Sequence, residues 1–303
     1  MQQDQGCVYA AVEQASSPQE APRDPLSGRR VAPRLAAGAA AFILLEALIF
    51  HTPLYSYFTE PESTTGMMET ILRSEIRRPK PDFRQALVVG HSRMGFLPRV
   101  ANELRGETGY TFGSICLGGT TPRVWYYQIR SVDPDRNRYA AVVIPCDDYD
   151  EPDAYEDLRD READLNYVLA RLKLADLWDF PWTHQRRDLQ WRAVSGILFK
   201  GYVYKRDFLA FLEHPIERIR KVRWYDRDSA GWRYDFHGAK DNLAGLTVDW
   251  ERKTVHLPEG FSPEVRKMAE SAFFGARPPD RGLYTAYYRY WYGRIVKHYE
   301  GSG

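Results

Sequence analysis

The chain has 303 residues, 44% of them hydrophobic, and a formal net charge of +1. This length can hold one sizeable globular domain beside a membrane anchor. The near-zero charge, with no basic patch interleaved with aromatic residues, argues against a nucleic acid partner. No spacing of cysteines or histidines typical of a zinc or iron site occurs, so we expect no cofactor and no metal.

The N-terminal part of the chain predicts a tail followed by a membrane span. Residues 1–30 are rich in Gln, Ser, Pro and acidic residues, a composition typical of disorder. Val31–Tyr55 is predominantly apolar and, at about 20–25 residues, long enough to cross a bilayer of ~30 Å. A cleaved signal peptide is the alternative, but the segment before the apolar core is too long and no small-x-small cleavage site follows it.

Basic residues mark the cytoplasmic side of this span. Four arginines precede the apolar core, and apart from His51 the next basic residue after it is Arg73. The positive-inside rule therefore predicts a cytoplasmic tail (1–30), one transmembrane helix (31–55) and an extracytoplasmic domain (56–303). The four arginines are Arg23, Arg29, Arg30 and Arg34.

Glu46 lies inside the apolar span. A carboxylate near the bilayer centre costs about 2.5–3.5 kcal/mol on insertion scales, so it should be protonated, paired or turned toward another protein. Ala37 and Ala41 form a small-xxx-small face that allows close approach of a second helix. We therefore expect Glu46, Ala37 and Ala41 to contact another membrane subunit within the lipid bilayer. The alternative is that Glu46 reaches the outer headgroups and the alanines pack against nothing.

Three apolar segments end in polar or glycine-rich turns. Ala86–Val89 predicts a buried strand that Gly90 ends just before Ser92. A second strand ends at Leu117 before a Gly-Gly turn, and a third, Ala140–Ile144, runs into acidic residues. Helices predicted over Pro98–Arg105 and Pro122–Asp133 lie between them. This βαβαβ order is typical of a doubly wound α/β sheet, in which ligands bind at the carboxyl ends of the strands.

The three segments resemble blocks I to III of the SGNH (GDSL-like) hydrolase superfamily. His91-Ser92 stands in the place of the Asp-Ser pair of block I, and Gly118-Gly119 in the place of the block II glycine. Asp147 replaces the block III asparagine. The resemblance implies a flavodoxin-like parallel sheet and ester hydrolysis or O-acyl transfer. It implies Ser92 as nucleophile, with Gly119 and Asp147 beside the oxyanion.

The order of anchor, three blocks and a helical insertion at about 151–234 resembles the membrane-anchored bacterial envelope branch of that superfamily. The resemblance implies a location in the bacterial inner membrane, with the C-terminal domain periplasmic or otherwise extracytoplasmic. It covers about residues 54–299, and its specific motifs lie only in Ala86–Asp148.

The catalytic base of the superfamily, an Asp-x-x-His near the C-terminus, is missing here. One alignment leaves Thr285 and Tyr288 in its place, and the other makes Leu283–Tyr299 the helix before an absent last strand. A phenol that titrates near ~10 is a poor base at neutral pH. His91 and His237 are the other candidate bases, and the Ser92 hydroxyl could instead cap the following helix.

The remaining elements are mostly helical. An Arg-rich run near the end of the insertion, including Arg218 and Lys221, is a solvated helix face or a contact for anionic headgroups or an acidic partner. The density of aromatic residues in the last helix predicts burial on more than one side. We expect helices over Met67–Arg77, Ala154–Trp178, Leu189–Lys200, Arg206–Val222, Ser262–Ala272 and Leu283–Tyr299, and a β excursion at Val248–Leu257.

These patterns favour a non-catalytic SGNH-like subunit, accessory or structural, of a bacterial membrane protein complex, with an energy-converting complex as one candidate. Its partners would be other membrane subunits, reached through the span and the outer domain. The alternative is an envelope O-acyltransferase or esterase that uses Ser92 as its nucleophile.

Overall fold

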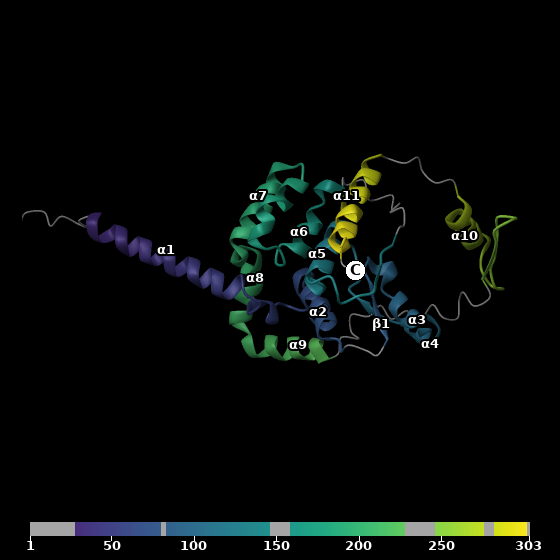
Figure 1. Cartoon of the computed structure of the whole chain (residues 1–303), viewed down its shortest axis with the longest axis horizontal. Helices are drawn as coiled ribbons and strands as arrows, with labels where there is room; N and C mark the ends of the chain where they lie inside the picture. The colour runs from purple at the N-terminus through teal and green to yellow at the C-terminus, as the bar shows by residue number, and fades with distance from the viewer. Residues whose placement is uncertain (1–27, 80–82, 146–157, 228–245, 276–281, 302–303) are drawn as a thin grey trace, which may run out of the picture. The chain divides into compact units, whose positions relative to one another are not determined.

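The computed structural model describes residues 28–79, 83–145, 158–227, 246–275 and 282–301 (Figure 1). The chain divides into two units, Met1–Leu45 and Glu46–Gly303. The described part is a mixed α/β structure with a small parallel sheet, many helices and one apolar helix near the N-terminus.

The apolar helix α1 spans Gly28–Phe50, and its stretch Val31–Phe50 is long and apolar enough to cross a membrane. It ends five residues before the predicted boundary at Tyr55. Pro53 explains this end, because proline lacks an N–H group and disfavours helical geometry in the preceding residue. Tyr55 instead begins a short 3₁₀ helix, η1 (Tyr55–Tyr57), and is buried in the protein.

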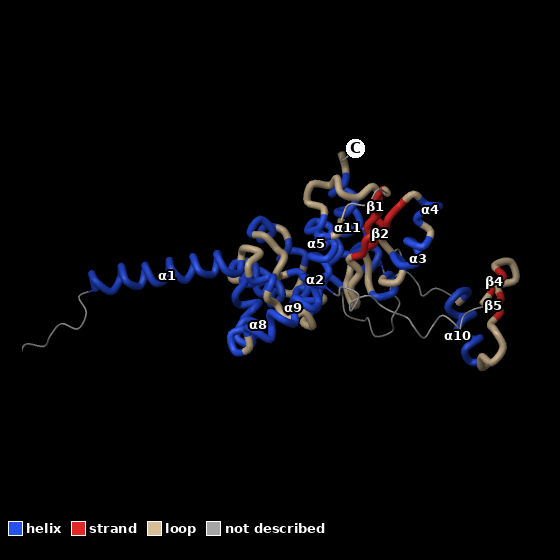
Figure 2. The backbone as a smooth tube through the Cα atoms, turned by 90° about the horizontal axis from the view of Figure 1, so that it is seen from below, coloured by secondary structure: helices blue, strands red, loops and turns tan. Residues whose placement is uncertain are grey.

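The three predicted strands form one parallel sheet in the order β2-β1-β3, with β1 in the centre. The strands are β1 (Arg84–Val88), β2 (Tyr110–Ser114) and β3 (Ala141–Val143). Strands are red in Figure 2, where β1 and β2 are labelled. The last four residues of β1 are buried, as expected for a central strand covered on both faces.

Helices join and cover these strands as the βαβαβ pattern predicts. The short helices α3 (Leu97–Glu103) and α4 (Arg105–Thr108) connect β1 to β2, and α5 (Pro122–Val132) connects β2 to β3. Helix α2 (Thr64–Arg77) precedes the sheet and contacts α5 and the later helix α6 (Glu162–Val168). The core that they share contains Leu72, Leu87, Ile115, Trp125, Leu165 and Trp291.

The predicted helix Ala154–Trp178 is wrong for its described part, which breaks into three pieces. These are η3 (Leu158–Asp160), α6 (Glu162–Val168) and η4 (Leu174–Trp178). The carboxylate of Asp176 accepts the backbone N–H of Lys173 at 2.6 Å, so a local side-chain bond replaces a helical one there. A further turn, η5 (Phe180–Thr183), follows.

The predicted helix Arg206–Val222 is also wrong, because it is two helices. Helix α7 spans Arg187–Leu198, α8 spans Lys200–Glu213 and α9 spans Pro215–Arg227. Pro215 separates the last two, since proline is tolerated in the first turn of a helix but not in its interior.

The C-terminal elements follow the predictions closely. Strands β4 (Thr247–Asp249) and β5 (Thr254–His256) pair antiparallel, and α10 (Pro263–Phe274) begins at its Ser262 cap, whose Oγ accepts from Val265 N.

The last helix, α11 (Gly282–Tyr299), packs against α5. Among the side chains described in α11, the predicted burial on more than one side is found in part: Tyr287, Trp291 and Ile295 are fully buried, Tyr288 and Tyr292 are half-buried against the same core, and Tyr290 is exposed. The three fully buried residues are four apart, so they lie on one helix face.

Candidate functional site

Ser92 lies at the carboxyl end of the central strand, as predicted. The chain leaves β1 through Val89 and Gly90 and enters a 3₁₀ turn, η2 (Ser92–Met94). A Cβ at Gly90 would lie 2.7 Å from Met94 Cγ and 3.2 Å from Pro145 Cδ, so the close approach of this turn requires glycine. Ser92 is half-buried there.

His91, not Ser92, caps this turn. Its Nδ1 accepts the backbone N–H of Arg93 at 3.2 Å, and its buried ring lies beside Trp125. The Nδ1 lone pair is therefore used by the backbone N–H of Arg93. The capping role that the sequence allows for Ser92 is filled in this turn by His91.

Gly119 occupies the glycine-rich turn after β2 and has a φ of +68°. This left-handed conformation favours glycine. The turn is held from outside: the Tyr167 hydroxyl donates to Gly118 O at 2.8 Å, and Arg161 Nη2 donates to Gly119 O at 3.1 Å. The predicted glycine-rich turn after β2 is thus present, and its two carbonyls accept hydrogen bonds from Arg161 and Tyr167.

A buried polar network lies next to this turn, and no sequence motif indicated it. Thr121 Oγ1 donates to Asp164 Oδ2 at 2.8 Å and lies 2.9 Å from the Tyr287 hydroxyl. Arg123 Nη1 is 3.5 Å from the same carboxylate oxygen, and all four side chains are buried. The network therefore joins α5, α6 and α11 at the carboxyl side of the sheet.

Burial dominates the titration of these groups. Desolvation raises the pKa of Asp164 despite the opposing effect of Arg123, and it raises the pKa of Tyr287 as well. His184, whose ring nitrogens lie 3.3 Å from Arg123 Nη1, has its pKa lowered to about 3 by burial and by that guanidinium. The side chains of this network bond to one another, and this mutual bonding indicates a structural role for the network.

The described histidines do not provide a base for Ser92. No hydrogen bond joins a described histidine to its hydroxyl, and His237 lies outside the described residues. His51 bonds to Leu198 O and His298 bonds to Asp133 O. Asp147 also lies outside the described residues, so its predicted place beside the oxyanion is not described. Within the described ranges, no group of three or more His, Cys, Asp or Glu is arranged to hold a metal ion.

Glu46, predicted to face another subunit, is paired within the chain. Its Oε1 accepts the backbone N–H of Gly201, in the first turn of α8, at 2.8 Å, and the side chain is only 8% exposed. Ala37 and Ala41 are exposed. At about 100° per residue they lie about 180° and 140° around the helix from Glu46, so one neighbouring helix cannot contact all three.

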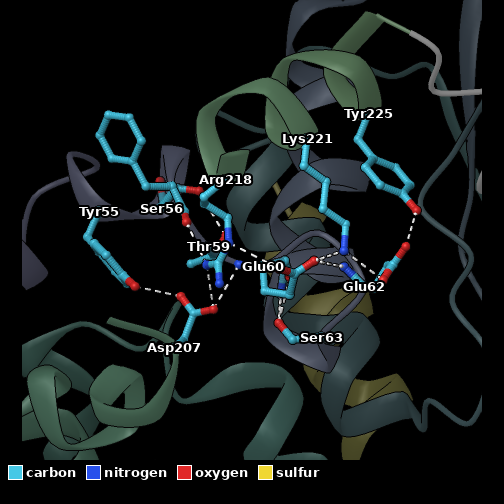
Figure 3. A network of polar contacts seen from close by, with 12 residues as sticks. Tyr55, Ser56, Thr59, Glu60, Glu62, Ser63, Asp207, Arg218, Lys221 and Tyr225 are labelled. Atoms are coloured by element: carbon cyan, nitrogen blue, oxygen red, sulfur yellow. Dashed lines mark hydrogen bonds and ion pairs between the residues drawn. The ribbon is translucent and has the colours of Figure 1, made fainter. Parts of the chain in front are cut away.

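The arginine-rich helix α9 is bound to the segment that follows α1 (Figure 3). Arg218 lies 2.8 Å from Asp207 Oδ1 and 3.0 Å from Glu60 Oε2, and it donates to Phe58 O. Lys221 Nζ lies 2.5 Å from Glu60 and 2.7 Å from Glu62. These two cations of the basic run are therefore neutralised by acidic residues of this chain.

Aromatic side chains continue this junction. Phe50, at the end of α1, packs with Tyr55, Tyr204 and Phe208, at ring-centre distances between 4.9 and 5.8 Å within the cluster. The Tyr55 hydroxyl donates to Asp207 Oδ2 at 2.6 Å. The start of the globular unit is thus fixed to α8 and α9 by both packing and charge.

Comparison with known proteins gives no further assignment. No family model, no curated protein and no solved structure matches this chain. The resemblance to the SGNH superfamily therefore depends on the residues of the three segments alone.

Proposed function

We propose that this protein is a membrane-anchored, non-catalytic member of the SGNH hydrolase superfamily and a structural or accessory subunit of a bacterial membrane protein complex. In this proposal α1 crosses the inner membrane with the tail in the cytoplasm, and the flavodoxin-like domain lies outside. The three-stranded parallel sheet and the apolar helix support the coarser part of the proposal.

The non-catalytic assignment is supported by side chains of α11, which are tyrosines in the region where the superfamily has its catalytic histidine. In the superfamily pattern the C-terminal region supplies the histidine, but here it brings tyrosines whose hydroxyls are already bonded. Tyr287 is bonded within the buried network, and Tyr292 donates to Pro145 O at 2.6 Å, just after β3. The only histidine of α11, His298, bonds to Asp133 O at the far end of α5. A phenol with a raised pKa cannot accept the Ser92 proton at neutral pH.

The exposed alanines of α1 support the subunit assignment. Ala37 and Ala41 offer a face on which a second helix can approach closely, and Glu46 turns to the opposite face. The face of α1 that carries Glu46 therefore bonds to α8 of this chain, and the face that carries Ala37 and Ala41 is available to a partner helix.

Site-specific photo-crosslinking in native membranes tests this proposal. A benzophenone amino acid at position 37 or 41 should give one discrete adduct with the same membrane subunit. Ala39, about 200° around the helix from Ala37, is the matched control and should give none. Ala37→Leu should reduce recovery of that subunit in mild detergent, whereas Ala39→Leu should not. Equal adducts from positions 37 and 39, or unchanged recovery with Ala37→Leu, would contradict the proposal.

An esterase or O-acyltransferase that uses Ser92 remains the second candidate. The observation in its favour is the position of Ser92, half-buried at the carboxyl end of the central strand, with the capping role taken by His91. That activity requires a base from outside the described residues or from another chain.

A further inference from the structure

Two hydrogen bonds attach the corner between α7 and α8 to the last turn of α1 and the residue after it. Glu46 accepts the N–H of Gly201 at 2.8 Å, and His51 Nε2 donates to Leu198 O at 3.2 Å. The Phe50 ring stacks on Tyr204 with ring centres 5.8 Å apart. The position of this corner is therefore fixed relative to the end of α1.

The bond to Glu46 also sets the depth of this corner. The apolar stretch ends at Phe50, and its 20 residues match the ~30 Å of a bilayer core at about 1.5 Å per residue. Glu46 is four residues earlier, so its Cα lies about 6 Å before the end of the span. Helical side chains point toward the N-terminus, which takes the carboxylate deeper still. The Gly201 N–H that it binds thus lies in the outermost part of the hydrocarbon, within about 10 Å of its boundary.

The residues around Gly201 are those expected at such a boundary. Leu198, Phe199 and Tyr202 are 39%, 45% and 67% exposed, although large apolar side chains rarely cluster at the surface of a soluble domain. Tyrosine and other aromatic residues concentrate at the membrane interface. Farther along α8, Lys205 and Arg206 are exposed and basic, as suits anionic headgroups.

We propose that the α7–α8 corner, defined as Leu198, Phe199 and Tyr202, inserts into the interfacial layer of the leaflet in which α1 ends. Lys205 and Arg206 then contact anionic headgroups of that leaflet. The proposal rests on the proposed function only in that α1 must cross the bilayer. A second membrane contact beside the span fixes the tilt of the domain, which a single helix alone leaves free.

Spin-label depth measurement on the full chain in nanodiscs tests the insertion. The nanodiscs contain phosphatidylcholine with phosphatidylglycerol, and Cys7 and Cys146 are replaced by serine. Cys116 can stay, because it is buried and its thiol pKa is raised to about 11 by burial. Single nitroxides are placed with Tyr202→Cys at the corner, Ala39→Cys in the span and Val100→Cys on α3 as the exposed control.

The expected result is that relaxation by oxygen exceeds relaxation by a water-soluble nickel complex several-fold at positions 39 and 202, and falls below it at position 100. If the label at position 39 reports lipid and the label at position 202 reports water, the insertion is overturned and the membrane anchor stands. If both labels report water, α1 does not cross the bilayer and the anchor itself is overturned. A label at 202 shielded from both reagents means that protein covers the corner, which also overturns the proposal.

The headgroup contact has its own control. Lys205→Gln with Arg206→Gln should lower the oxygen-to-nickel ratio at position 202 in nanodiscs with phosphatidylglycerol. The same pair should change nothing in nanodiscs of phosphatidylcholine alone. An equal effect in both lipids would contradict the electrostatic part of the proposal.

Discussion

The bond between Glu46 and α8 offers the sharpest perturbation of this structure. Helix α8 begins after Phe199, which provides no side-chain cap. A helix start normally finds such an acceptor in a neighbouring residue, but here Glu46, 155 residues away in the sequence, accepts the N–H of the first turn. Loss of a cap costs about 0.5–2 kcal/mol, and a carboxylate near a helix N-terminus adds about 0.3–1 kcal/mol. We therefore expect Glu46→Leu to destabilise the first turn of α8 by about 1–2 kcal/mol.

Hydrogen exchange of the full chain in nanodiscs measures this effect locally. A loss of about 1–2 kcal/mol speeds exchange of the Gly201 amide by roughly 5–30-fold. Glu46→Gln keeps an acceptor oxygen and loses only the charge, so its effect should stay below about 1 kcal/mol. Peptides from α10 act as the internal reference. Unchanged exchange in α8 with Glu46→Leu, or equal exchange in the Leu and Gln variants, would refute the capping role.

Four further substitutions test the packing, with a matched control, the charge network and the buried histidine. A Cβ at Gly201 would meet the Glu46 carboxylate and lie 3.0 Å from a Phe50 ring carbon, so Gly201→Ala should lower the free energy of unfolding by about 1–3 kcal/mol in urea titration. Gly293→Ala, at an exposed position of α11 with open space for a methyl group, should raise it by up to about 1 kcal/mol. Asp207→Asn breaks a half-buried ion pair and should lower the urea midpoint at unchanged m-value. The pKa of His184 is about 3 in the folded protein and about 6.5 in the unfolded chain. The free energy of unfolding should therefore fall as the pH falls from about 6.5 to about 3, because only the unfolded chain binds the proton there. His184→Gln should make the free energy of unfolding depend less steeply on pH in this range.

The strands and the turns after them were predictable because their signals are local. Apolar runs such as Ala86–Val89 end at glycine, and this pattern gives both the strand and the position of Ser92. The break at Pro215 was also predictable in principle, because proline is disfavoured inside a helix. The capping bond at the start of η4, in which Asp176 accepts the Lys173 N–H, could not be predicted from periodicity.

The polar contacts could not be predicted because their members are far apart in the chain. Asp164 lies on what the sequence presents as a solvated helix face, and only folding brings Thr121 and Tyr287 to it. The same holds for Glu46, because insertion energetics indicate that a carboxylate needs a partner but not which one. The partner proved to be a backbone amide of the same chain.

Reaction with a fluorophosphonate tests the central claim most directly. The purified full chain is incubated with the probe at neutral pH, beside its Ser92→Ala variant and a known serine esterase as positive control. The account predicts no labelling of the wild type, because a serine without a base keeps an ordinary, unreactive hydroxyl. Labelling of the wild type that disappears in Ser92→Ala would contradict it and establish Ser92 as a nucleophile.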